Sequence, residues 1–180
     1  MIGRQAVRYA RAERMPPGAL RMFGESVTPM ASPWLLKSAA PVRQSSDLEQ
    51  FTLIEAGDAH RSTHLQWLSW RRWFDAQGCP LLQPQRWLYF NYAHQIVQAA
   101  LAGQGLALAR LPLVADALAS GDLVEVLPGT RLDSPLAYWL LLGPRSRQRP
   151  EAQAFTAWLR QEAGATRRFL GEGSEDADQA

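Results

Sequence analysis

Long apolar runs, paired cysteines and a strong net charge are all missing from this 180-residue sequence. The longest uncharged apolar run, residues 134–144, is much shorter than the roughly 20 residues that a membrane-spanning helix needs. Cys79 is the single cysteine, so no disulfide can form within the chain and a disulfide-stapled secreted scaffold is excluded. The arginines near the N-terminus are not followed by the apolar core of a signal peptide. Together these absences predict a cytoplasmic protein.

Charge is nearly balanced. The formal net charge of +2 argues weakly against a dedicated nucleic-acid surface. One local cluster of arginines near the N-terminus is opposed only by Glu13. We interpret it as a solvated loop or strand end, with phosphate binding as the less favoured alternative; its members are Arg4, Arg8, Arg11 and Arg14.

Residue patterns typical of catalysis or metal binding are also scarce. His60 and His64 stand four apart, but no third ligand follows at a convincing spacing. Cys79 lies in a Gly-Cys-Pro turn, where an inert thiol is the favoured interpretation over a nucleophile. Gly103-x-Gly105 follows a helix and precedes a strand, the reverse of a dinucleotide loop, so helix capping by Gly103 explains it. We therefore predict no enzyme, no cofactor and no metal.

What the sequence does contain is an alternation of short β-prone runs and helical patterns. Strands are predicted over residues 6–9, 26–31, 51–54, 87–90, 106–109, 123–127 and 137–142. Helices are predicted over residues 34–39, 65–77, from 91 to the Gly103 turn, from 111 to 120, and from Pro150 onward. This order predicts an α/β architecture with largely parallel sheets.

Two of the predicted helices carry aromatic faces. Trp67, Trp70 and Phe74 share one face of the helix over residues 65–77. The inner face of the last helix is assigned to Phe155, Trp158 and Leu159. We interpret the seven tryptophans as core residues rather than a base-stacking platform, because they cluster at helical spacing. From Gly164 onward the apolar content is too low to pack, which predicts a disordered tail.

One feature favours ligand binding. Asn91 and Tyr92 directly follow a strand and open a helix, with Asn91 placed as the N-cap. Backbone amides and the positive end of the helix dipole would then face a crevice, a natural seat for a carboxylate. Ordinary capping without a ligand is the alternative.

Several motifs in order carry a family resemblance. They are AVRYAR at residues 6–11, ESVTPMASP at 25–33, WRRWFDAQG at 70–78, LARLPLV at 108–114, AYW at 137–139 and AFTAWL at 154–159. With the strand and helix order of residues 90–128, they resemble the effector-binding domain of LysR-type bacterial transcription regulators. Within that family they are most similar to the glycine-cleavage-activator-like branch.

The resemblance implies an α/β fold of two Rossmann-like lobes of periplasmic-binding-protein type (type 2). It assigns residues 1–32 to a remnant of lobe I with the first crossover, 33–128 to lobe II, 129–163 to the return crossover and the end of lobe I, and 164–180 to the tail. Family members also carry a winged helix-turn-helix, a linker helix and the first elements of lobe I, none of which is found here. The first lobe is therefore expected to be incomplete, with an exposed sheet edge and apolar surface.

The resemblance also implies a small effector, an amino acid or another carboxylate, held between the lobes and acting allosterically on an oligomer. Arg11 or Arg110 is a candidate partner for an anionic effector, and each could equally be a surface charge. The positions that match the family's cleft are Tyr9, Ala10, Arg11, Ser32, Asn91, Tyr92, Leu108, Arg110 and Leu111.

Three functions follow as hypotheses. The first is the effector-sensing part of a LysR-type regulator, with contacts to like chains and with DNA bound only through the winged helix-turn-helix domain that this sequence lacks. The second is a stand-alone interaction module that modulates intact regulators. The third, a small enzyme, would need a titratable constellation that the sequence does not contain. No membrane partner is expected.

Overall fold

The computed structural model describes residues 5–57 and 65–173 of the chain. The chain separates into two compact units. Unit 1 comprises Met1–Glu25 with Ser134–Ala180, and unit 2 comprises Ser26–Asp133. The chain therefore passes from unit 1 into unit 2 after Glu25 and returns after Asp133. None of the helices in the described ranges is long and apolar enough to cross a membrane.

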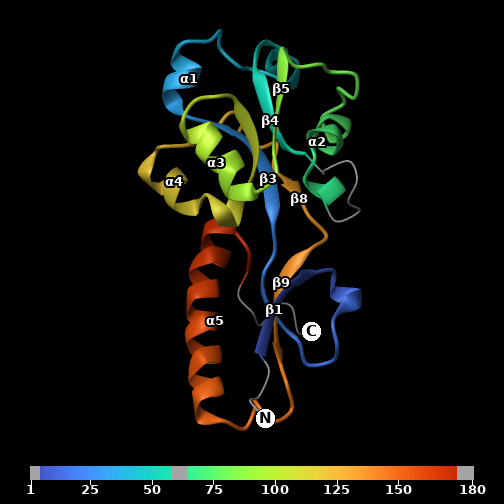
Figure 1. The fold of residues 1–180 in the computed structure, drawn as a ribbon, viewed down its shortest axis with the longest axis vertical. Helices are drawn as coiled ribbons and strands as arrows, with labels where there is room; N and C mark the ends of the chain where they lie inside the picture. The colour runs from blue at the N-terminus through green and yellow to red at the C-terminus, as the bar shows by residue number, and fades with distance from the viewer. Residues whose placement is uncertain (1–4, 58–64, 174–180) are drawn as a thin grey trace. The chain divides into compact units, whose positions relative to one another are not determined.

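Unit 2 is built on a mixed sheet with the strand order β5-β4-β6-β3-β7, to which β8 adds beside β3 (Figure 1). Parallel pairing joins β4 to its neighbours β5 and β6. β3 runs antiparallel to β6, β7 and β8. The strands are β3 (Ser26–Ala31), β4 (Thr52–Ala56), β5 (Arg86–Phe90), β6 (Leu106–Arg110), β7 (Val124–Glu125) and β8 (Leu132–Asp133).

The prediction of largely parallel sheets is thus right only for the strands from β4 to β6. Parallel neighbours need a crossover connection, usually a helix. α2 (Trp70–Ala76) supplies that connection between β4 and β5, and α3 (Ala93–Leu101) supplies it between β5 and β6. β3 stands outside this parallel run, because it is antiparallel to its neighbour β6. In the sequence, β4 and β5 lie between the two strands.

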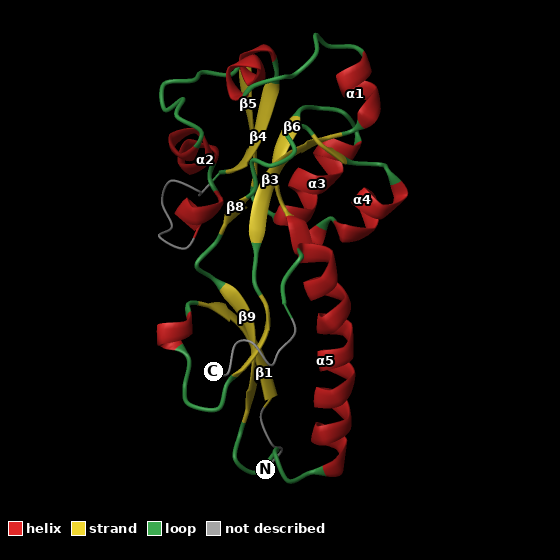
Figure 2. Cartoon of the chain, turned by 180° about the vertical axis from the view of Figure 1, so that it is seen from behind, coloured by secondary structure: helices red, strands yellow, loops and turns green. Residues whose placement is uncertain are grey.

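Helices cover both faces of this sheet. α2 lies on one side, and α3 with α4 (Ala115–Ser120) lies on the other, as the two opposite views agree (Figures 1 and 2). α1 (Pro33–Lys37) follows β3 directly. The remaining turns are the 3-10 segments η2 (Ser45–Gln50), η3 (Leu65–Leu68) and η4 (Leu111–Leu113).

The helix predicted over residues 65–77 is broken at Ser69. Ser69 has extended backbone angles and its hydroxyl accepts the Arg72 amide at 3.3 Å, so α2 begins one residue later. Trp67 is consequently outside α2, where the Arg72 guanidinium lies 3.7 Å from its ring centroid. The buried faces of α2 are Trp70, Trp73 and Phe74, whose ring centroids stand 5.6 to 5.7 Å apart.

The glycines after α3 act on the backbone. Gly103 has a φ of +68° and closes a Schellman cap, in which the Gln104 amide donates to the Ala99 carbonyl at 2.9 Å. This confirms the predicted capping role. At Gly105 an added Cβ would lie 2.4 Å from the Thr52 carbonyl oxygen, so the close approach of β4 requires glycine there.

Unit 1 contains a three-stranded sheet with β9 (Ala137–Leu142) between β1 (Gln5–Ala10) and β2 (Leu20–Phe23), both antiparallel to it. A 3-10 segment, η1 (Ala12–Arg14), follows β1. The long helix α5 (Pro150–Leu170) packs against β2, with Met22, Leu140 and Ala163 at the centre of the contact. Pro150 stands in the first turn of α5, as predicted.

Leu159 packs against the core of unit 1, as predicted for the inner face of α5, but the placement of Phe155 and Trp158 on that face and the disordered tail are wrong. Phe155 and Trp158 are 39% and 54% exposed, whereas the buried residues of α5 are Ala152, Ala163 and Arg167. The helix also continues through Leu170, past the point at which disorder was predicted, and only residues 174–180 of that tail lie outside the described range. The low apolar content does not prevent helix formation here, because polar contacts hold the end of the helix. The buried Arg167 guanidinium donates to the carbonyls of Arg21 and Met22 in β2.

Candidate functional site

A cavity of about 210 Å³ opens in unit 2 at the carboxyl ends of β4, β5 and β6. The carboxyl edge of parallel strands is where open α/β sheets usually bind ligands. The described residues of its walls are mostly apolar, with one acid, Glu55, and one base, Arg110. The lining residues are Ile54, Glu55, Ala56, Leu68, Trp70, Asn91, Tyr92, Ala93, Ile96, Leu108 and Arg110.

Strand register brings the acid and the base to one side of the sheet. The parallel pairing of β4 with β6 sets Ile54 beside Ala107, so Glu55 stands beside Leu108 in the next step. Arg110 follows Leu108 by two residues and therefore projects from the same face. Glu55 and Arg110 are thus diagonal neighbours in the sheet, and both line the cavity.

Glu55 is fixed in place by α2. Its side chain is only 3% exposed, and Oε1 accepts the Trp70 backbone amide at 2.9 Å. The Trp70 indole in turn donates from Nε1 to the Ile54 carbonyl at 2.9 Å. These two bonds pin the start of α2 to the end of β4 and position both lining residues.

The start of α3 forms the opposite wall. Tyr92, not the predicted Asn91, is the N-cap, and it makes no side-chain capping bond. Gln95 and Ile96 make the first intrahelical bonds, both to the Tyr92 carbonyl, so the amides of Ala93 and His94 precede the hydrogen-bonded part of the helix. This amino end carries the positive pole of the helix dipole.

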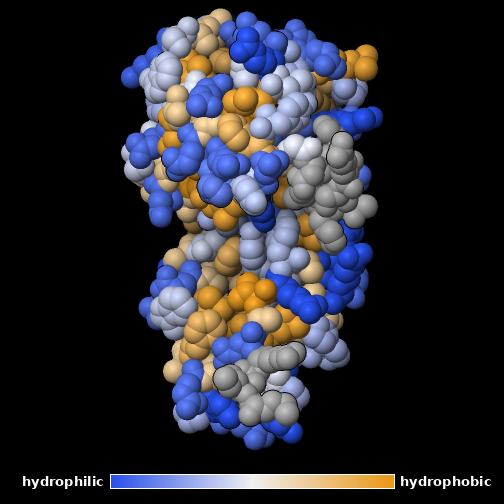
Figure 3. Space-filling view, viewed as in Figure 1, coloured by the Kyte–Doolittle hydropathy of each residue, from blue (hydrophilic) through white to orange (hydrophobic). Residues whose placement is uncertain are grey.

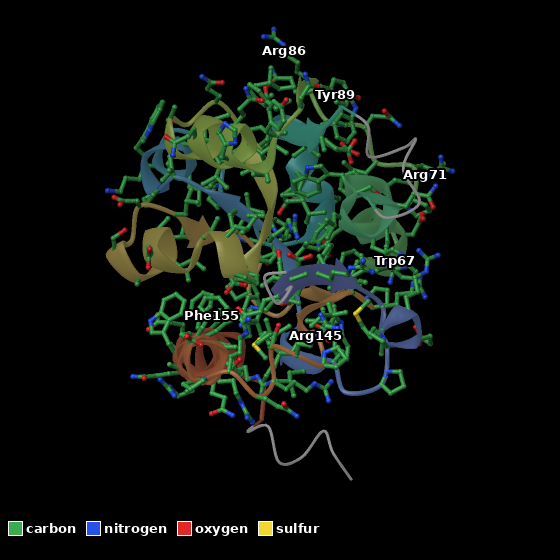
Figure 4. The ribbon with its side chains drawn as sticks, turned by 60° about the horizontal axis from the view of Figure 1, so that its bottom comes forward. Trp67, Arg71, Arg86, Tyr89, Arg145 and Phe155 are labelled. Carbon is green, nitrogen blue, oxygen red and sulfur yellow. The ribbon has the colours of Figure 1, made fainter. Side chains whose placement is uncertain are left out.

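The electrostatic character of the cavity therefore comes from a small number of groups. Arg110 is the one cation among its described lining residues. Arg71 in α2 and Arg86 in β5 are exposed and point outward (Figure 4). Partial burial, and secondarily the negative charge of Glu55, raise the pKa of Tyr89 above its ordinary value. Tyr89 is the partner of Glu55 in the pairing of β5 with β4.

Four of the predicted site residues meet at this cavity, namely Asn91, Tyr92, Leu108 and Arg110. Two others in unit 2 do not line it. Leu111 is fully buried in η4, and Ser32 is 2% exposed at the start of α1, because both side chains point into the packed interior.

The remaining three lie in unit 1, with Tyr9 and Ala10 at the end of β1 and Arg11 directly after it, and their part in effector binding stays a prediction. There the Tyr9 hydroxyl donates to the carboxylate of Glu25, and its ring lies 4.9 Å from that of Tyr138. The Tyr138 hydroxyl donates to the same carboxylate at 3.4 Å.

Sequence reasoning missed Glu55, the one acid among the described residues that line the cavity. The sequence did contain a signal, since Glu55 is a charged residue that interrupts the apolar run of β4. Only the register between β4 and β6 shows that it lies beside Leu108 and Arg110.

The sequence also offered candidates for metal binding and for a nucleophile. No group of three or more His, Cys, Asp or Glu side chains suited to a metal occurs among residues 5–57 and 65–173. His60 and His64 lie outside the described residues. Burial raises the pKa of the Cys79 thiol, which reduces the thiolate fraction that a nucleophile needs.

Comparison with known proteins agrees with this architecture. Residues 6–164 match the family model of the LysR substrate-binding domain. The glycine cleavage system transcriptional activator of Escherichia coli (strain K12) is 26% identical over 160 residues, which are 89% of this chain and 50% of that protein. The transcriptional activator AmpR of Pseudomonas aeruginosa is 28% identical over 155 residues, 86% of this chain and 48% of its own. The chain thus spans about half the length of the curated relatives it matches.

Solved structures show the same fold. The effector domain of AmpR from Pseudomonas aeruginosa aligns with a TM-score of 0.68 at 26% identity, covering 94% of this chain and 76% of that one. The AmpR effector-binding domain from Citrobacter freundii aligns with a TM-score of 0.65 over 89% of this chain and 74% of that one, and at 21% identity this likeness concerns the fold alone. The predicted α/β class of periplasmic-binding-protein type is confirmed.

Proposed function

The chain belongs to the LysR substrate-binding domain family, whose matched relatives are transcriptional regulators and not enzymes, and from this premise we propose that it is the effector-sensing part of such a regulator. The effector is a small carboxylated molecule, and the cavity of unit 2 is where it binds. We place the protein in the cytoplasm and in an oligomer, with DNA contacts made outside the matched residues 6–164.

The observation that carries this proposal is the convergence of two anion-binding features on one cavity. Arg110 and the amino end of α3 line the same 210 Å³ space, which is otherwise largely apolar. A guanidinium pairs with a carboxylate through two parallel hydrogen bonds, and helix amino ends attract anions through unpaired amides and the dipole. A carboxylate between them would satisfy both.

Thermal unfolding with a panel of small carboxylates and amino acids tests the proposal. A compound at about 100 times its Kd should stabilise the native state by about 2.7 kcal/mol, which raises Tm by several degrees. Arg110→Gln should remove most of this stabilisation, because it takes away the charge and the paired donors.

Arg86→Gln is the matched control, since Arg86 is an exposed arginine of unit 2 outside the cavity. The proposal fails if no compound of the panel raises Tm, or if both variants respond like the parent chain.

A second candidate function is an interaction module that binds intact regulators. It is favoured by the exposed apolar residues Val7, Phe155 and Trp158 of unit 1 and by the outer edge of β1, which pairs with no other strand of the described chain. Co-purification with an intact LysR-type regulator should then be lost in Val7→Arg and retained in Leu113→Arg, a similarly exposed aliphatic position of unit 2. Equal behaviour of the two variants would remove this candidate.

A further inference from the structure

We propose that the cavity of unit 2 selects an α-amino acid with a small aliphatic side chain, with Glu55 binding its ammonium group and Arg110 binding its carboxylate. The inference rests on the proposed effector-binding function and narrows the class of ligand. A simple carboxylate would use only the positive side of the cavity. An amino acid in its zwitterionic form uses both charges.

The position of Glu55 is the first argument. Its carboxylate lines the cavity although the residue is only 3% exposed, so its charge acts in a medium that screens poorly. Oε1 accepts the Trp70 amide, and a carboxylate offers about four acceptor sites in total, so that bond leaves capacity for an ammonium group. A ligand carrying only negative charge would meet repulsion at this point.

The spacing of the charged residues is the second argument. Neighbouring strands lie about 4.8 Å apart and rise about 3.3 Å per residue, so the Cα atoms of Glu55 and Arg110 are roughly 8 Å apart. The two side chains leave the same face of the sheet. They can therefore hold the two ends of a short zwitterion, whose charged groups are separated by a single carbon atom.

The size and walls of the cavity are the third argument. A cavity of about 210 Å³ that opens to solvent has room for an amino acid of the size of valine or leucine. Ile54, Leu68 and Ile96 supply apolar surface for its side chain.

An ion pair of Glu55 with Arg110 is the competing account of the same residues. In that account the two charges neutralise each other, and the cavity takes uncharged or apolar molecules. The two accounts differ in what an amine group on the ligand does to affinity, which calorimetry measures directly.

The experiment titrates the full chain with L-valine, with 3-methylbutanoate, which lacks the amine, and with 2-methylpropylamine, which lacks the carboxylate. We expect L-valine to bind at least about tenfold more tightly than either analogue, because each lacks one charge-assisted contact. In Glu55→Gln the preference for L-valine over 3-methylbutanoate should fall to within about threefold. The amide that replaces the carboxylate retains an oxygen that accepts the Trp70 amide, and circular dichroism verifies that the variant folds.

Glu125→Gln is the matched control, because Glu125 is another acid of unit 2 that pairs with Arg131 outside the cavity. It should retain the full preference. Equal binding of L-valine and 3-methylbutanoate to the parent chain overturns the inference and leaves the proposed function standing. A preference that survives in Glu55→Gln overturns the role of Glu55. Binding of none of the three probes overturns the inference, whereas the proposed function fails only if the wider carboxylate panel is also silent.

Discussion

The sheets of the two units are buried in different ways. Unit 2 covers both faces of its sheet with helices, and its interior holds Trp70, Trp73 and Phe74. Unit 1 has one long helix over three strands. The buried apolar residues described in unit 1 are Met22, Leu136, Ala137, Leu140, Ala152 and Ala163, half of them alanines.

Unit 1 exposes several large apolar side chains. Val7 and Trp158 are each 54% exposed, and Figure 3 shows apolar residues gathered over this unit. In Figure 4, Phe155 projects from the side of α5. The comparison indicates that the unit with the larger core holds the candidate cavity, while the other unit depends more on polar contacts. Stability should therefore differ between the two units.

Polar contacts fasten unit 1 at several places. Arg167 bonds β2 carbonyls, and Arg21 forms an ion pair with Glu172 at 3.0 Å. At the point where the chain leaves the unit, the Ser134 amide donates to the Glu25 carbonyl at 2.8 Å. The first two contacts hold the C-terminal end of α5 to β2, and the third joins the segments at which the chain leaves unit 1 and returns to it.

The largest effect should come from the core of unit 2. Trp70→Ala removes a fully buried ring that contacts Trp73 and Phe74, together with a hydrogen bond to the Ile54 carbonyl. We expect a loss of about 3–5 kcal/mol in the free energy of unfolding, measured by denaturant titration. Trp158→Ala, at an exposed tryptophan of unit 1, should cost less than about 1 kcal/mol. Similar losses in both variants would contradict the assignment of the main core to unit 2.

A smaller effect should appear when α5 loses its buried arginine. Arg167→Ala leaves the carbonyls of Arg21 and Met22 without this donor, so we expect roughly 2 kcal/mol of destabilisation, localised to unit 1. Hydrogen exchange should accelerate in α5 and β2 but not in the sheet of unit 2. Arg168→Ala, at the exposed neighbouring position, serves as the control and should leave exchange unchanged.

The smallest effect concerns pH. The hydrogen bond and charge of Arg131 hold the pKa of Glu125 below its ordinary value of 4.5, with a further bond from Thr28. A lowered folded-state pKa means that the pair stabilises unit 2 above the unfolded pKa and loses this contribution as the pH falls through the folded pKa. Because Arg131 is 39% exposed, we expect at most about 1 kcal/mol.

The measurement is denaturant unfolding of the parent chain and Glu125→Gln between neutral pH and about pH 3. The stability difference between them should shrink as the carboxylate is protonated. A difference that stays constant over this range would show that the ion pair contributes nothing measurable.

Local patterns in the sequence were sufficient for most individual elements. The strands β3, β4, β5, β6 and β9 lie where alternation and turn residues predict them, and Gly103 ends α3 as its conformational freedom requires. Local signals failed where a competing contact was stronger. Ser69 divides the tryptophan segment because its hydroxyl caps α2, and Phe155 and Trp158 face outward although their spacing suggests a buried stripe.

The sequence by itself therefore determined the order of elements, the family resemblance and four residues of the candidate site, because these depend on neighbours along the chain. Only the tertiary structure decided which strands pair in which direction and that Glu55 stands with Arg110 at one cavity. It also decided that α5 continues to Leu170. The physical reason is that register and burial depend on groups far apart in the sequence, such as β4 beside β6 and Arg167 beside β2, and no local pattern encodes such pairings.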